Sequence, residues 1–235
     1  MEKVLNCGVD EAGRGCVLGP LVLASCTLNP EQEIFFKKLG VKDSKLLSKS
    51  KRIDFFNIIK EKSTEFSIIL VPAEELNVLM NRYSLNEIEA IKTAEMIKNL
   101  KINPNVLILD CPDTNADKYK KRMISNFNIL KYDYKFNIVS EHKADLNHIS
   151  VSCASVLAKV VRDQMISELT GLDISGYSSD PKTIKYLKEY IIKNKKIPPF
   201  ARDKWETINN VMNELYQNKI GWFYDKKSWW NWQSN

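Results

Sequence analysis

The chain has 235 residues, of which 44% are hydrophobic and 27% charged, with only 8 glycines. This length suits one large α/β domain or two small ones, and the composition excludes a disordered or fibrous protein. No apolar run approaches the roughly 20 residues of a membrane helix, and the charged first ten residues do not resemble a signal peptide. We therefore expect a soluble, cytoplasmic, monomeric protein without a membrane partner.

The net charge is +6, which is compatible with a polyanionic partner such as a nucleic acid. The five cysteines lie far apart and form no CxxC pair, so they indicate buried thiols rather than disulfides or a zinc site. The chain has only two histidines. Any bound metal ion must therefore be held by carboxylates.

Apolar runs predict five strands, over residues 3–9, 17–28, 66–71, 106–109 and 134–139. Helical periodicity predicts six helices, over residues 50–62, 84–100, 114–126, 149–169, 183–195 and 205–218. Ser84, with Glu87 three residues later, is typical of a capping box. A strand hairpin followed by strands that alternate with helices is typical of an α/β fold with a five-stranded mixed sheet flanked by helices. The last helices would form a C-terminal extension.

Asp10 and Glu11 end the first predicted strand and lead into Gly13, Arg14 and Gly15. Glycines let backbone N–H groups approach a ligand closely. Adjacent strand residues point to opposite faces, so both carboxylates can reach one site only where the strand ends, and we expect that end here. A solvated turn with a helix-cap carboxylate is an equally weighted alternative.

Two further carboxylates follow in the sequence. Asp110 ends the strand over 106–109, where open α/β sheets place their sites, and Asp145 precedes the longest helix. Each of them alone could be a helix cap. Together with Asp10 and Glu11 they predict a site for Mg²⁺ or Mn²⁺, because hard cations prefer oxygen ligands. Two such ions about 4 Å apart can support phosphodiester hydrolysis.

The longest predicted helix carries Ser152, Ser155, Lys159 and Arg162 on one face. For Lys159 and Arg162, an ion pair with Asp163 or with a sheet carboxylate is at least as well supported as contact with a substrate.

Two loops carry further candidate substrate contacts. Ser44 and Lys45 offer a hydroxyl and an ammonium group suited to a phosphate. Tyr177 lies in a loop bounded by glycine and proline, where it could stack on a sugar or base or could simply pack.

The segment Asp10-Glu-Ala-Gly-Arg-Gly15, followed by Gly19-Pro-Leu-Val22, resembles the opening signature of ribonuclease HII (type 2 ribonuclease H), in its archaeal and eukaryotic branch. Later segments resemble the family's other motifs in the same order: Asp43-Ser-Lys45, Lys143-Ala-Asp145, Val151-Ser-Cys-Ala-Ser155 with Ala158-Lys-Val160, Arg162-Asp163, and Gly176-Tyr177 with Ser179-Asp-Pro181. The resemblance spans residues 4 to about 205. The chain departs from these motifs at Cys153, at residues 146–149 and at Ser178, and none of these changes removes a predicted ligand.

This resemblance implies a ribonuclease H-like fold and a hydrolase of DNA replication and repair. Such an enzyme hydrolyses RNA in RNA/DNA hybrids and incises 5′ of ribonucleotides embedded in duplex DNA, leaving 3′-hydroxyl and 5′-phosphate ends. The residues that would bind two metal ions and catalyse are Asp10, Glu11, Asp110 and Asp145. The residues that would bind substrate are Gly13, Arg14, Gly15, Ser44, Lys45, Lys143 and Tyr177, with the backbone of residues 13–15 sensing the ribose 2′-hydroxyl.

We divide the chain into a catalytic domain, residues 1–205, and a C-terminal helix with an aromatic tail, residues 206–235. In the tail, Gln217, Ile220, Phe223 and Tyr224 fit the pattern of a sliding-clamp-binding motif, whose apolar side chains would form a hydrophobic plug. The same residues could instead pack against the catalytic domain, and the pattern leaves both interpretations open.

Two other functional classes compete with the enzyme described above. One is a non-catalytic module that binds RNA/DNA hybrids through a degenerate site, and the other is a related nuclease with a different substrate choice. All four acids are present, which favours an enzyme over the binding module.

Overall fold

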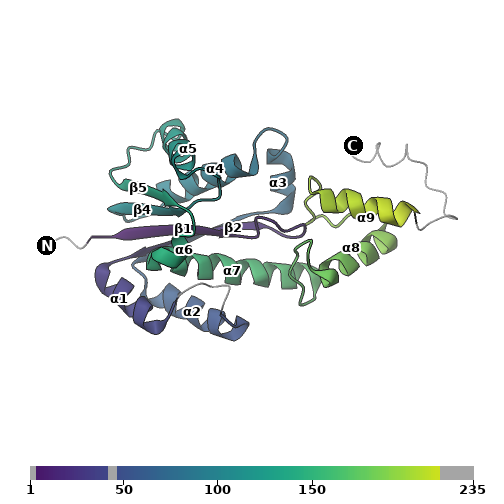
Figure 1. Ribbon diagram of the computed structural model, residues 1–235, viewed down its shortest axis with the longest axis horizontal. Helices are drawn as coiled ribbons and strands as arrows, with labels where there is room; N and C mark the ends of the chain where they lie inside the picture. The colour runs from purple at the N-terminus through teal and green to yellow at the C-terminus, as the bar shows by residue number, and fades with distance from the viewer. Residues whose placement is uncertain (1–3, 42–46, 218–235) are drawn as a thin grey trace.

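The structure, a computed structural model, describes residues 4–41 and 47–217. Its centre is a five-stranded mixed sheet with the strand order β3-β2-β1-β4-β5 (Figure 1). The strands are β1 (Asn6–Ala12), β2 (Leu21–Leu28), β3 (Glu65–Val71), β4 (Val106–Asp110) and β5 (Asn137–Glu141). The first three strands are antiparallel, and β4 and β5 run parallel to β1. The predicted fold class is confirmed.

The helices are α1 (Pro30–Leu39), α2 (Lys49–Lys62), α3 (Ala73–Leu79), α4 (Leu85–Lys98), α5 (Ala116–Ile129), α6 (Ala144–Asn147), α7 (Ile149–Thr170), α8 (Pro181–Asn194) and α9 (Glu206–Gln217). Helices α4 and α5 cover one face of the sheet, and α1, α2 and α7 cover the other (Figure 1). No helix among the described residues is long and apolar enough to cross a membrane.

Side chains along β1 alternate between the two faces of the sheet, and this explains how helices pack on both faces. Cys7 and Val9 point into the apolar core formed with α4 and α5. Gly8 points the other way, and a methyl group at this position would overlap the backbone of Ser150 and Val151 in α7. The glycine therefore allows α7 to lie directly against β1.

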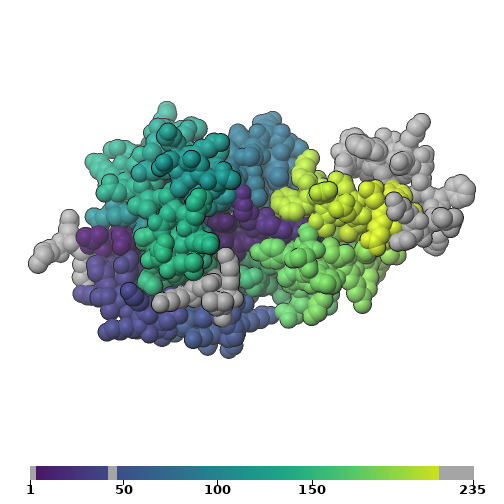
Figure 2. Space-filling view, in the orientation of Figure 1, coloured from purple at the N-terminus to yellow at the C-terminus, as the bar shows by residue number. Residues whose placement is uncertain are grey.

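The C-terminal helices extend the body at one end (Figure 2). Ile208 and Val211 of α9 share an apolar core with Leu187 and Ile191 of α8 and with Val17. The division of the chain at residue 205 stays a prediction.

The five predicted strands and six predicted helices are all present, with two boundary errors near the N-terminus. The first error is that β2 begins at Leu21 and not at residue 17, because Val17 donates its backbone N–H to Gly176 O at 2.9 Å and Leu18 forms a bridge with Ala201. The second is that β1 does not end at Asp10 and Glu11 but continues to Ala12. Three shorter helices, α1, α3 and α6, were not predicted.

Five predicted site and clamp residues lie outside the described residues: Ser44, Lys45, Ile220, Phe223 and Tyr224.

Asp180 caps the N-terminus of α8 and closes the loop that carries Tyr177. Its carboxylate accepts hydrogen bonds from Ser175 N (2.8 Å), Ser175 Oγ (2.7 Å), Thr183 Oγ1 (3.0 Å) and Lys182 N (2.9 Å). Although slight burial opposes ionisation, these hydrogen bonds lower the pKa of Asp180 to about 2. The ionised carboxylate therefore stabilises the folded state.

We expect Asp180→Ala to lower the free energy of unfolding by about 1 kcal/mol at pH 7, or by about 2–4 °C in Tm. The folded pKa lies below the unfolded one, so this contribution is present above about pH 4 and is lost as the pH falls toward 2. Thermal melts of both proteins between pH 7 and pH 2 would measure it. Asp54→Ala, at an exposed position of α2, is the control and should change little. A difference that persists unchanged at pH 2 would contradict the assignment.

Candidate active site

The site lies where β1 and β4 separate. β1 pairs with β4 only as far as Val9 and Leu109, whereas it pairs with β2 as far as Ala12 and Val22. Beyond Val9, the edge of β1 that faces β4 lies beside the carboxyl end of β4. Asp110, the last residue of β4, is therefore a neighbour of the Asp10–Glu11 segment, although that segment lies inside a strand.

As neighbours in a strand, Asp10 and Glu11 leave the backbone toward opposite faces of the sheet, but their carboxyl groups still form a side-chain hydrogen bond with each other. The Asp10 carboxylate forms a hydrogen bond with Ser155 of α7. Glu11 faces the α4 side, where the charge of Glu89 acts on it. Asp110 interacts electrostatically with both carboxylates, so it links the two faces.

Burial and mutual repulsion make these carboxylates hard to ionise. Burial, followed by the charges of Glu11 and Asp110, raises the pKa of Asp10 well above its usual value. Burial, Glu89 and Asp110 together raise the pKa of Glu11 to about 8, although the nearby Arg14 guanidinium opposes the shift. A cation bound between them would favour the charged forms.

Asp145 is attached to the same region through its backbone. Ala144 N donates a hydrogen bond to Asp110 Oδ1 at 2.9 Å, and Ser152 Oγ of α7 donates to the carbonyl oxygen of Asp145 at 2.6 Å. The residue is buried, with 6% of its surface exposed. Lys143, two residues earlier, is exposed and has left-handed backbone geometry (φ 57°).

The donor set consists of carboxylate oxygens, which are the ligands that Mg²⁺ and Mn²⁺ prefer. As the side chains stand, however, no group of three or more histidine, cysteine, aspartate or glutamate residues in ranges 4–41 and 47–217 could hold a metal ion. The chemistry and the repulsion among Asp10, Glu11 and Asp110 fit a divalent cation. The four-carboxylate metal site stays a prediction.

The structure brings the two described substrate loops together. Cys16 and Tyr177 form an isolated β-bridge, and a methyl group at Gly15 would lie 3.8 Å from Tyr177 Cε1. Gly13 has φ 91°, and a side chain there would meet Pro20 O at 2.7 Å. The Tyr177 ring thus lies directly beside the loop of residues 13–15, the glycine loop.

The ion pairs considered for Lys159 and Arg162 are confirmed. Lys159 Nζ lies 2.8 Å and Arg162 Nη1 lies 3.1 Å from Asp163 Oδ1. Arg162 also has a second function, because its guanidinium carbon lies 5.1 Å from the centre of the Tyr177 ring. Its Nη2 contacts Cys16 Sγ at 2.8 Å. This fully buried arginine therefore supports the tyrosine from beneath.

The Arg14 side chain is directed toward α4, where it forms an ion pair with Glu89 and a hydrogen bond with Asn86 Oδ1. Its carbonyl oxygen accepts a hydrogen bond from Arg202 Nη1 at 3.0 Å. The Arg14 side chain is therefore directed away from the loop of residues 13–15. Only the Arg14 backbone keeps the position predicted for a substrate contact.

Sequence reasoning missed Glu89 and Arg202. One buried face of α4 carries Glu89, Thr93 and Met96 at helical spacing. A charged residue on that otherwise apolar face could have indicated that Glu89 is buried. Arg202 follows a short apolar segment, and we find no comparable signal for its burial.

The chain is similar to known proteins over most of its length. The family model described as ribonuclease HII matches residues 7–208. Ribonuclease HII of Methanocaldococcus jannaschii is 40% identical over 225 residues, covering 91% of this chain and 97% of that protein. The one from Pyrococcus furiosus is 38% identical, covering 93% and 96%.

Solved structures show the same relationship. The ribonuclease H2 of Pyrococcus horikoshii OT3 superposes with a TM-score of 0.81 and 32% identity, covering 91% of this chain and 99% of that one. The ribonuclease HII in a PCNA complex from Archaeoglobus fulgidus gives a TM-score of 0.75 and 36% identity, covering 86% and 95%. The chain therefore belongs to the ribonuclease HII family and is a metal-dependent endoribonuclease.

Proposed function

We propose that the chain incises duplex DNA on the 5′ side of an embedded ribonucleotide and hydrolyses RNA in RNA/DNA hybrids, leaving 3′-hydroxyl and 5′-phosphate ends. The observation that carries the proposal is the position of Asp10, Glu11 and Asp110, which interact where β1 and β4 separate, beside the loop of residues 13–15. Carboxylates supply the phosphodiester chemistry and the loop supplies the choice of sugar. The non-catalytic module is not favoured, because the chain belongs to a family of nucleases.

In this proposal Asp10, Glu11, Asp110 and Asp145 hold Mg²⁺ or Mn²⁺, with two ions present when substrate is bound. When bound, such ions activate the attacking water and stabilise the leaving oxygen. The protein's part is to draw the four carboxylates together from β1, β4 and the α6 turn. Burial, and then mutual repulsion, raises the pKa of Asp10 and Glu11, and a bound cation would offset that repulsion and so favour this closure.

The 2′-hydroxyl is the only sugar group that distinguishes RNA from DNA at a given position. The proximity of Gly15 to the Tyr177 ring supports a shared recognition site, in which the backbone of residues 13–15 hydrogen-bonds the hydroxyl and the ring stacks on the neighbouring deoxyribose. Burial raises the pKa of Tyr177 to about 12, so its phenol stays neutral at physiological pH. Ser44, Lys45 and Lys143 would hold phosphates.

We also propose that residues 217–224 bind a sliding clamp. The support is the motif formed by Gln217, Ile220, Phe223 and Tyr224, together with the relative from Archaeoglobus fulgidus whose structure is a PCNA:RNase HII complex. In the sequence this region directly follows α9.

We expect Asp10→Asn and Asp110→Asn each to lower turnover roughly 10³-fold or more, because a lost ligand charge weakens the cation site. Affinity for the substrate should change less than about threefold, because the phosphate and sugar contacts remain. Single-turnover cleavage and fluorescence anisotropy on the same hybrid would measure both. Asp117→Asn, at an exposed position of α5, is the matched control. Near-normal turnover in either site variant would refute the metal-site assignment.

A duplex DNA with one ribonucleotide should be cut at least roughly 10³-fold faster than the same duplex without it, because only the first presents a 2′-hydroxyl. Tyr177→Ala should slow this cleavage about tenfold through lost stacking. Gel analysis of the products locates the cut. Comparable cleavage of plain DNA would show a related nuclease with a different substrate choice.

Replacing Phe223 and Tyr224 by Ala should weaken clamp binding about 30-fold or more, since such apolar anchors dominate small interfaces. Cleavage without the clamp should be unchanged. Calorimetry with purified archaeal PCNA would measure the affinity, with Gln233→Ala as the control. Unaltered clamp affinity in the double variant would leave only the alternative that these residues pack against the catalytic domain.

A further inference from the structure

The loop of residues 13–15 has one side chain, that of Arg14. Asn86 and Glu89, on the first two turns of α4, bind it. Arg14 stands between Gly13 and Gly15, and its guanidinium bonds Asn86 Oδ1 through Nη2 and Glu89 Oε2 through Nη1. Glycine peptides are conformationally free. The orientation of the peptide groups in this loop therefore depends on where the Arg14 side chain is anchored.

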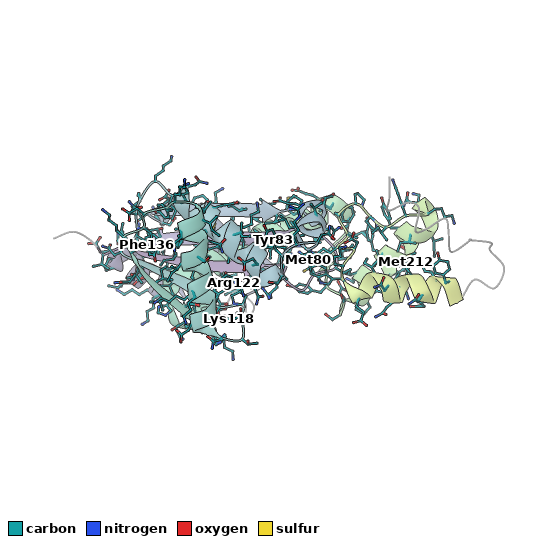
Figure 3. All side chains as sticks on the ribbon, turned by 90° about the horizontal axis from the view of Figure 1, so that it is seen from above. Met80, Tyr83, Lys118, Arg122, Phe136 and Met212 are labelled. Carbon is teal, nitrogen blue, oxygen red and sulfur yellow. The ribbon has the colours of Figure 1, made fainter. Side chains whose placement is uncertain are left out.

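Asn86 connects the loop to the strand end that carries Asp110. Its side chain also forms a hydrogen bond with Asp113, three residues after Asp110. Asp113 is in turn held by Arg122 of α5, labelled in Figure 3, whose Nη2 lies 3.3 Å from Asp113 Oδ2. Asn86 thus bridges the segment that we propose to sense the sugar and the segment that follows a predicted catalytic carboxylate.

The Arg14 backbone is held as well as its side chain. The fully buried Arg202 donates to Arg14 O and, through Nε, to Gly19 O, both at 3.0 Å. Anchors from α4 and from the segment before α9 therefore fix the same residue. Small displacements of this residue would move both neighbouring peptides.

Burying the Glu89 carboxylate costs free energy that a purely structural role does not explain. Its side chain is 1% exposed, and its Oε1 atom has no hydrogen-bond partner among the described residues. A buried carboxylate with one cationic partner rarely stabilises a fold more than an apolar residue of similar size would. Its position beside Glu11 and its contact with Arg14 instead suit a role in the site.

We propose that Asn86 and Glu89 are positioning residues for 2′-hydroxyl discrimination, which act through Arg14 to hold the peptides of residues 13–15 in place relative to Asp110. This inference rests on the proposed function, because it assumes that these peptides sense the sugar. It adds two residues of α4 that act through their contacts with Arg14.

Asn86→Ala and Glu89→Gln test the inference on the duplex with a single ribonucleotide. A misplaced loop should lower kcat about 10- to 100-fold, because errors near 1 Å can cost this much. KM should stay within about threefold, because the phosphate contacts are unchanged. Glu95→Gln is the matched control on the same helix, outside this network, and should behave as the wild type.

A double-mutant cycle separates positioning from general stability. If Asn86 acts through Arg14, the variant that combines Asn86→Ala with Arg14→Ala should have the kcat of Arg14→Ala alone, within about twofold. Multiplying losses would overturn the inference, because they would show that the two residues act independently. Melting temperatures establish that each variant is folded at the assay temperature.

The outcomes distinguish this inference from the function on which it rests. A wild-type enzyme that fails to prefer the ribonucleotide duplex would refute the proposed function. A wild-type enzyme with that preference, together with variants that keep kcat within about twofold, would overturn the positioning role alone. Asn86 is only partly buried, so Asn86→Ala decides the question if Glu89→Gln does not fold.

Discussion

The close approach of α7 to β1 is the constraint on which the site depends. It requires Gly8, because any side chain there would overlap the backbone at the start of α7. At this distance Ser155 reaches Asp10, and Ser152 reaches the carbonyl group of Asp145. A larger residue at position 8 would push the helix outward and would separate carboxylates that come from distant parts of the chain.

The second constraint is electrostatic. Asp10, Glu11 and Asp110 lie close enough to repel one another, so the site is a concentration of negative charge where the pairing of β1 with β4 ends. Arg14 offsets part of that charge on the α4 side. The raised pKa values favour the protonated, neutral carboxyl groups when no cation is bound. In the proposed function, protons and a divalent cation therefore compete for these groups.

Much of the fold was predictable, because long periodic segments such as α7 and apolar runs such as β4 carry their own signals. The errors have local causes. α1 was missed although Asn29, Pro30 and Gln32 form a capping box with proline at the first turn. The start of β2 was misplaced because Val17 and Leu18 bond to segments more than 150 residues away, which apolar pattern alone does not reveal.

For the site, the sequence predicted which residues take part but not how their side chains are oriented. Motif resemblance named the carboxylates and the glycine loop, because their types and order are specific. It did not indicate that the Arg14 side chain faces α4, since orientation depends on partners elsewhere in the chain, here Asn86 and Glu89. The expectation that the strand ends at Asp10 and Glu11 was wrong, because pairing with β2 continues β1 to Ala12.

Two buried arginines hold the loop of residues 13–15, which we propose to sense the 2′-hydroxyl. Arg162 lies beneath Tyr177 and contacts Cys16, and Arg202 holds Arg14 and Gly19 through their carbonyl oxygens. Hydrogen bonds discriminate between ligands only when donors and acceptors are held to within about 0.5 Å. A planar guanidinium with five donors can fix several backbone and side-chain groups at once, which a lysine cannot. In the proposed function, the two buried arginines therefore make the loop of residues 13–15 rigid enough to select one sugar.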